Sequence, residues 1–150
     1  MKKFSFSLQK ILEIKEQILD NFKIELSSLN ADLINIDLAI KNLKLQYTST
    51  NKELLEKSSA GISVGEMTYY KILMNGILKQ VDKKESEKLI VNKKIELKRQ
   101  EIVNMNMEIS SIEKLKEKEL ERYNHAVTRN EEIFIEEFVS NKSLANNYAI

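Results

Sequence analysis

Apolar residues in the first part of the chain recur in alternating steps of four and three residues. The residues that keep this spacing are Leu29, Leu33, Ile36, Ile40, Leu43 and Tyr47, and upstream Leu8, Ile11, Ile18, Phe22 and Leu26. A repeat of 3.5 residues is typical of the seam of a coiled coil. The pattern predicts a first helix over about residues 6–58, and one irregular step between Phe22 and Leu26 indicates a local change of supercoil.

A second stripe with the same spacing runs through the other half of the chain. Its members are Tyr70, Met74, Ile77, Val81, Val91, Ile95, Ile102, Met105, Ile109 and Ile112. Lysines occupy three further positions of this stripe, Lys84, Lys88 and Lys98, where a charged group weakens a seam and helps to set its register. The stripe predicts a second helix over about residues 64–142, followed by a polar tail, 143–150, that we expect to fray.

Most of the helix-breaking residues lie between the two stripes. Gly61 suits the left-handed position that ends a helix. Ser63 and Glu66 have the spacing of a capping box, in which the hydroxyl and the carboxylate accept hydrogen bonds from otherwise free backbone amides. These signals predict a turn over about residues 59–65, with the second helix beginning directly after Ser63.

Two apolar stripes joined by a short turn predict an all-α fold, an antiparallel two-helix coiled-coil hairpin that forms a single domain over residues 1–150. Its arms are unequal, roughly 80 and 115 Å long at a rise of 1.5 Å per residue. Residues beyond about 120 have no partner in the first helix. Apolar residues nevertheless continue there at helical spacing, at Tyr123, Val127, Phe134 and Phe138. An apolar stripe without an internal partner is a candidate interface.

The composition agrees with long helices and excludes several classes of protein. The chain of 150 residues has no proline, cysteine or tryptophan and only three glycines, so it cannot make the frequent turns of barrels and sandwiches. Without cysteine, disulfide scaffolds and thiolate zinc sites are excluded. No apolar run approaches the roughly 18 residues that span a bilayer. Charged residues also interrupt any signal-peptide core, and we therefore expect a cytoplasmic protein.

Residues that could carry chemistry are sparse. The single histidine, His125, has Glu121 as its one close candidate co-ligand, which is too little for a metal site. The glutamates at helical spacing are typical of a solvated helix face, and a two-helix fold has no concave pocket for catalysis or for a small-molecule substrate. We expect no catalytic residue, no metal and no cofactor.

Charge is distributed unevenly along the second helix. Nine basic and four acidic residues lie between Lys71 and Arg99, whereas five basic and ten acidic residues lie between Glu101 and Glu137. Blocks of like charge steer the choice of partner. Glutamates interleave the lysines of the basic block and the formal net charge of the chain is +1, so we expect no nucleic-acid partner.

At the start of the second helix, apolar and aromatic residues surround the helix instead of lining one stripe. The seam accounts for Tyr70 and Ile77, which leaves Tyr69, Ile72 and Leu73 facing away from the first helix. Two interpretations stay open. The residues could pack locally at the hairpin turn, or they could form a docking surface, because aromatic and methionine side chains are favoured at protein interfaces.

Four segments of the chain together match the pattern of a known family. The chain opens on F-x-F-x-L-x-x-[IL]-L between Phe4 and Leu12, and a glycine-containing turn separates its two helices. A tyrosine followed by apolar residues begins the second helix, at Tyr70, Leu73 and Ile77. R-x-E and [LIM]-[DE]-E-[FA] motifs close the chain, the first at Arg129 to Glu131 and the second at Ile135 to Phe138. With these motifs the chain resembles the FliJ family of flagellar export proteins over nearly its whole length.

The resemblance implies a non-enzymatic component of the flagellar type III secretion apparatus, with a fold similar to the γ-subunit stalk of rotary ATPases. It implies that the protein binds the hexameric export ATPase, promotes assembly of the ATPase ring and contacts the export-gate membrane protein FlhA, with export chaperones as further partners. Such a protein is peripheral to the cytoplasmic face of the membrane.

The family pattern also implies two sets of binding residues. The residues that would bind the ATPase are Arg129, Glu131, Phe134, Ile135, Glu136, Glu137 and Phe138. The residues that would face the export gate are Tyr70, Leu73 and Ile77. The polar end from Asn141 to Ile150 departs from the basic or alanine-rich end that is frequent in the family.

Three alternatives to the flagellar stalk stay open from the sequence. One is the equivalent stalk of a virulence type III secretion system, which genomic neighbourhood would distinguish. Another is a homodimeric coiled-coil scaffold in which the first helix pairs with another chain, which the molar mass in solution would reveal. A third is an export chaperone that binds a cargo segment, which would co-purify with its substrate.

Overall fold

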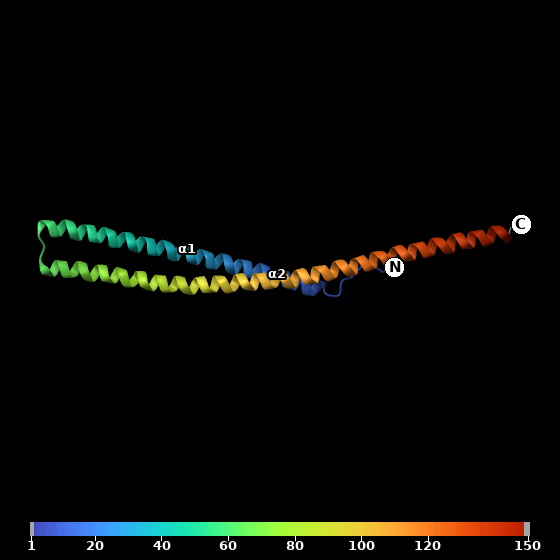
Figure 1. The fold of residues 1–150 in the computed structure, drawn as a ribbon, viewed down its shortest axis with the longest axis horizontal. Coiled ribbons are helices and arrows are strands. Elements are labelled where there is room, and N and C mark those ends of the chain that lie inside the picture. Colours follow the sequence, from blue (N-terminus) through green and yellow to red (C-terminus); the bar gives the residue numbers. More distant parts are fainter. Residues whose placement is uncertain (1, 149–150) are drawn as a thin grey trace. The chain divides into compact units, whose positions relative to one another are not determined.

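The computed structural model describes residues 2–148, which contain two α-helices and no strand. Helix α1 spans Gln9–Ala60 with 52 residues, and helix α2 spans Val64–Tyr148 with 85 residues. Figure 1 shows the two helices joined at one end by a short connection. The all-α prediction of two helices packed against each other is therefore confirmed.

The connection between α1 and α2 has the local geometry that its sequence predicts. Gly61 adopts a left-handed φ of 92°, and its amide donates to the carbonyl of Ser58 at 3.2 Å. The Ser63 hydroxyl oxygen accepts a hydrogen bond from the Glu66 amide at 3.2 Å, as expected of an N-cap. With both helix ends capped, the connection needs only three residues, fewer than the predicted turn over about residues 59–65.

The chain divides into two compact units, which we describe separately. In the unit formed by residues 20–103, α1 and α2 run antiparallel on either side of the connection (Figure 1). Every predicted seam residue of α2 in this unit is buried or half-buried. The most buried side chains are Ile40, Tyr70, Met74, Ile77, Val81 and Ile95.

Lysines at seam positions of this unit reach acidic partners on α1. The ammonium group of Lys88 lies 2.8 Å from the Asp37 carboxylate. That of Lys98 lies 2.5 Å from Glu25 and 4.5 Å from the centre of the Phe22 ring. The aliphatic stem of a lysine covers apolar surface while its charge stays near water, so these positions are filled without an unpaired buried charge.

The second unit comprises residues 2–19 together with residues 104–148. Its two segments also run antiparallel, because Lys15 bonds Glu108 at 2.7 Å while the earlier Gln9 bonds the later Lys116 at 2.8 Å. The most buried side chains of this unit are Phe6, Leu12, Leu19 and Ile109.

The predicted seam was wrong at Ile11, near the start of α1. Ile11 is exposed and the predicted Ile18 is half-buried, whereas Leu12 and Leu19, which were not predicted, are buried. The seam runs from Leu8 through Leu12, Lys15 and Leu19 to Phe22 in regular steps of four and three residues, so the expected irregular step is absent from it. Two apolar stripes one residue apart compete here. The buried stripe contains Lys15, whose ammonium group lies 2.7 Å from the Glu108 carboxylate.

Both outer helix ends differ from their predicted positions. α2 continues to Tyr148 instead of ending near residue 142, because no glycine or proline follows Gly76 to interrupt it. Of the tail expected to fray, 149–150 lie outside the described residues. α1 begins at Gln9 instead of residue 6, and the preceding residues pack on α2. Phe4 lies 5.6 Å from the Tyr123 ring centre, and the Tyr123 hydroxyl donates to the Lys2 carbonyl at 2.7 Å.

Candidate interaction surfaces

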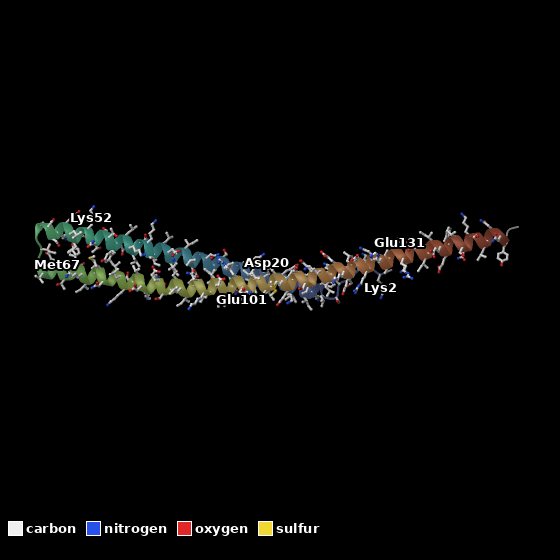
Figure 2. All side chains as sticks on the ribbon, viewed as in Figure 1. Lys2, Asp20, Lys52, Met67, Glu101 and Glu131 are labelled. Atoms are coloured by element: carbon white, nitrogen blue, oxygen red, sulfur yellow. The ribbon has the colours of Figure 1, made fainter. Side chains whose placement is uncertain are left out.

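The last part of α2 is the largest solvent-exposed stretch of helix in its unit. Tyr123 is the last residue of α2 that bonds the N-terminal segment, and every residue from Thr128 to Tyr148 is exposed. Figure 2 shows this part of α2, where Glu131 is labelled, with side chains projecting on all sides of a single helix. We call residues 124–148 the C-terminal stretch.

All residues that the family pattern assigns to ATPase binding lie on the C-terminal stretch. Phe134 and Phe138 are 70% and 61% exposed and stand one turn apart, so their rings share one face of the helix. Ile135 and Val139 form a neighbouring row with the same spacing. Exposed apolar side chains of this size in a continuous row are typical of an interaction surface.

Shallow grooves and acidic side chains flank the apolar row. One groove is lined by Val127, Asn130, Glu131, Phe134 and Ile135, and the next by Ile135, Glu136, Val139, Ser140, Ser143 and Leu144. Four glutamates, residues 131, 132, 136 and 137, stand against the single cation Arg129 between residues 128 and 141. The surface therefore offers apolar contact within a negative field, which suits a partner with basic residues around an apolar groove.

The three residues that the family pattern assigns to the export gate have different environments. Tyr70 and Ile77 are 6% and 7% exposed and belong to the core between α1 and α2, whereas Leu73 is 41% exposed. Of this set, Leu73 alone offers much of its side chain to a partner. Tyr69 and Ile72 are exposed beside it, as the spacing of the seam residues predicts.

Tyr70 is held from three sides, which fixes the helix face that carries Leu73. Its hydroxyl donates to the Glu53 carboxylate at 3.0 Å, and its ring packs edge-on against Tyr69 at 5.7 Å. The Lys57 ammonium lies 5.2 Å from the ring centre, and the pKa of Lys57 is raised by Tyr70 and, to a lesser degree, by Glu53. A groove beside this cluster is lined by Leu45, Gln46, Ser49, Thr50, Leu73, Ile77 and Gln80.

Sequence reasoning missed the role of the N-terminal segment. Phe6 is almost fully buried. Phe4 packs against Tyr123, a residue that the helix lengths predict to have no partner within the chain. The available signal was the pair of phenylalanines directly before the first helix. Because of this segment, the uncovered stripe of α2 begins after Tyr123.

Candidate metal ligands do not gather within residues 2–148. No cluster of three or more histidine, cysteine or acidic side chains in this range could hold a metal ion. The imidazole of His125 lies 3.8 Å from the Glu121 carboxylate, and both side chains are largely exposed. Neither helix, as far as it is described, is long and apolar enough to cross a membrane.

Comparison with known proteins gives one match. The model of the family described as "Flagellar FliJ protein" matches residues 4–147, which is nearly the whole chain. No curated protein and no solved structure matches.

Proposed function

The chain belongs to the FliJ family of flagellar export proteins, and we propose that within flagellar type III export it binds the hexameric export ATPase, promotes assembly of the ATPase ring and contacts the export gate protein FlhA. FliJ proteins are non-catalytic components of the export apparatus. Contact with FlhA would hold the protein peripherally at the cytoplasmic face of the membrane, with export chaperones as further partners.

The uncovered C-terminal stretch is the observation that carries the ATPase assignment. A helix of a water-exposed protein normally buries its apolar face, and exposed phenylalanines are costly unless a partner covers them. Phe134 and Phe138 are exposed on a stretch that also contains the R-x-E motif at Arg129. This placement supports an ATPase contact made by the two rings, with the glutamates around them selecting a basic rim.

The exposure of Leu73 supports a gate contact that involves fewer of the assigned residues than the family pattern implies. Leu73 would make the direct contact, with Tyr69 and Ile72 extending the apolar area. Tyr70 and Ile77 would act by holding the α2 face in place through their packing against α1. No chemistry is needed for either contact. The protein would couple its two partners by binding one conformational state of a partner more tightly than another state.

The ATPase contact is tested by a double substitution on the C-terminal stretch. We expect Phe134→Ala with Phe138→Ala to lower the affinity for the purified export ATPase of the same organism by at least about ten-fold, because exposed aromatic anchors contribute most of the energy of such contacts. The matched control is Leu89→Ala with Leu97→Ala, which removes two similarly exposed apolar side chains from α2. Equal affinity of both double variants and the wild type would reject the assignment.

The gate contact is tested in the same way with one residue. Leu73→Ala should weaken binding to the purified FlhA cytoplasmic domain, while Ile90→Ala, which also shortens an exposed side chain of α2, should leave that binding unchanged. Both variants should keep wild-type affinity for the ATPase. If Leu73→Ala binds FlhA as the wild type does, the gate contact lies elsewhere.

A further inference from the structure

The side of α2 that faces away from α1 combines lysines with exposed apolar side chains. Its members each follow a seam residue by two positions, which is a rotation of about 200° around the helix axis. They are Lys79, Lys83, Ser86, Ile90, Lys93 and Leu97. We call these six residues the basic face. All of them are exposed, and the apolar Ile90 and Leu97 are 56% and 67% exposed.

The three lysines of the basic face keep their charge uncompensated. Within residues 2–148, neither Lys79, Lys83 nor Lys93 forms an ion pair with an acidic side chain. The spacing of the basic face continues in both directions, from Tyr69 to Gln100, without meeting an acidic residue. This side of α2 therefore offers positive charge and apolar surface together, with no negative charge on the same row.

Acidic residues of this part of α2 lie on its flanks, where basic residues neutralise two of them. The Glu87 carboxylate lies 3.1 Å from the ammonium group of Lys84, and the Glu96 carboxylate lies 3.9 Å from the guanidinium group of Arg99. Asp82, the remaining acidic residue beside the basic face, is exposed. The field in front of the basic face is therefore positive, which attracts an anionic partner.

An anionic lipid surface matches both kinds of residue on the basic face. Lysines on flexible stems reach the phosphates of headgroups, while exposed apolar side chains enter the boundary between headgroups and acyl chains. The phosphate backbone of a nucleic acid would meet the lysines but leave Ile90 and Leu97 in water. The alternation of lysine with apolar side chains thus favours lipid.

From this arrangement we propose that α2 lies on an anionic lipid bilayer through the basic face, while α1 stays packed on the opposite side of α2. The face is about 27 Å long at a rise of 1.5 Å per residue, so α2 lies along the membrane plane over this length. The contact is made with the lipid itself and needs neither the ATPase nor FlhA. It uses none of the residues that the family pattern assigns to those partners.

Sedimentation of the full chain with vesicles tests the contact. The chain should sediment with vesicles that contain phosphatidylglycerol and stay in solution with vesicles of phosphatidylcholine alone. Added salt should weaken the binding, because it screens the lysines from the headgroups. A chain that stays in solution with both kinds of vesicle overturns the proposal, whether or not it binds the ATPase or FlhA.

Removal of the three charges tests whether the basic face makes the contact. The variant Lys79→Gln with Lys83→Gln and Lys93→Gln should bind vesicles with phosphatidylglycerol at least about ten-fold more weakly than the wild type. Its circular dichroism should be unchanged, because all three side chains are exposed.

The matched control removes the same charge from α1. Lys23→Gln with Lys41→Gln and Lys52→Gln changes three exposed lysines of the same unit, and this variant should bind vesicles as the wild type does. An equal loss of affinity in both triple variants would show attraction by net charge alone and contradict a defined face.

The apolar side chains distinguish lipid from nucleic acid. Ile90→Ser with Leu97→Ser keeps every charge but should weaken binding to vesicles with phosphatidylglycerol by about three-fold or more. Unchanged vesicle binding of this variant would contradict the proposal. So would a wild type that binds a DNA oligonucleotide more tightly than these vesicles, since a nucleic acid would then be the partner of the lysines.

Discussion

Leu73 and Ile77 lie one turn apart on α2, and their surroundings differ because the seam passes through Met74 and Ile77 and leaves Leu73 outside it. Ile77 packs in the seam against α1, while Leu73 lies at its edge beside Tyr69. An exposed leucine contributes little to folding, so it is available to a partner at small cost. A buried isoleucine contributes mainly to stability. The two residues therefore separate binding from folding within one turn of helix.

Stability measurements distinguish these two roles. We expect Ile77→Ala to lower the free energy of unfolding by about 2 kcal/mol or more, since it leaves a cavity in the core. Leu73→Ala should change the free energy by less than about 1 kcal/mol. Urea denaturation followed by circular dichroism measures both. A large loss in Leu73→Ala would place this side chain in the core and remove the argument for its exposure to FlhA.

Lysines with acidic partners make stability depend on alkaline pH. Hydrogen bonds with Asp37 raise the pKa of Lys88, and hydrogen bonds with Glu101 and Glu25 raise that of Lys98, above the ordinary value of 10.5. A lysine whose pKa is raised on folding stabilises the fold fully below the unfolded value. This contribution is lost as the pH rises through the higher folded value.

The free energy of unfolding should therefore fall as the pH rises above 10.5, the ordinary lysine value. The decrease should be smaller in the variant Lys88→Met with Lys98→Met, which lacks the two titrating groups but keeps their apolar stems. Both proteins carry the same remaining titratable groups, so the difference between the two curves isolates the two lysines. Superimposable curves would contradict a stabilising role of these ion pairs.

Individual seam residues could be predicted where a single apolar stripe exists, and not where two compete. All ten predicted seam residues of α2 are buried or half-buried. Near the start of α1, however, Ile11 and Leu12 belong to alternative stripes with similar hydrophobicity. The buried stripe contains Lys15, whose ion pair with Glu108 joins residues far apart in the sequence. A local pattern does not contain that information.

At the scale of elements, the residue at which the chain can turn determines where α1 ends and α2 begins. Gly61 is the one residue of the described chain with a positive φ, and an added Cβ would meet nothing within 4 Å. The requirement for glycine is therefore conformational and not steric. Gly76 has similarly open surroundings within α2, but its backbone is helical.

Alanine substitutions at the two glycines should have effects of opposite sign. Gly61→Ala should lower the free energy of unfolding by about 1 kcal/mol, because a side chain disfavours the left-handed conformation. Gly76→Ala should raise it by up to about 1 kcal/mol, since alanine is the better helix former. Thermal and urea unfolding measure both. A stabilised Gly61→Ala variant would be incompatible with the capped connection described above.

Element ends were less predictable than the elements themselves. The connection carries strong local signals in Gly61, Ser63 and Glu66, and it was predicted from them. The end of α2 carries none, so the helix continues past residue 142 to Tyr148. The segment before Gln9 packs Phe4 on Tyr123 of α2 and buries Phe6, a tertiary arrangement that helical periodicity does not reveal.

At the scale of the molecule, membership of the FliJ family gives the flagellar export role, and the exposed surfaces suggest how that role is performed. The uncovered C-terminal stretch was predicted from the unequal lengths of the two helices, because the longer helix must extend beyond the end of the shorter one. Two surfaces on separate residues would let the chain meet the ATPase and the gate independently.

The most direct test of the proposed function is addition of the full chain to the purified export ATPase of the same organism. We expect the fraction of hexameric ATPase in sedimentation velocity and the rate of ATP turnover both to rise with added chain until they saturate. We also expect the chain to sediment with the hexamer. If the chain sediments alone, and neither the hexamer fraction nor the turnover changes, then the proposed ATPase contact is contradicted.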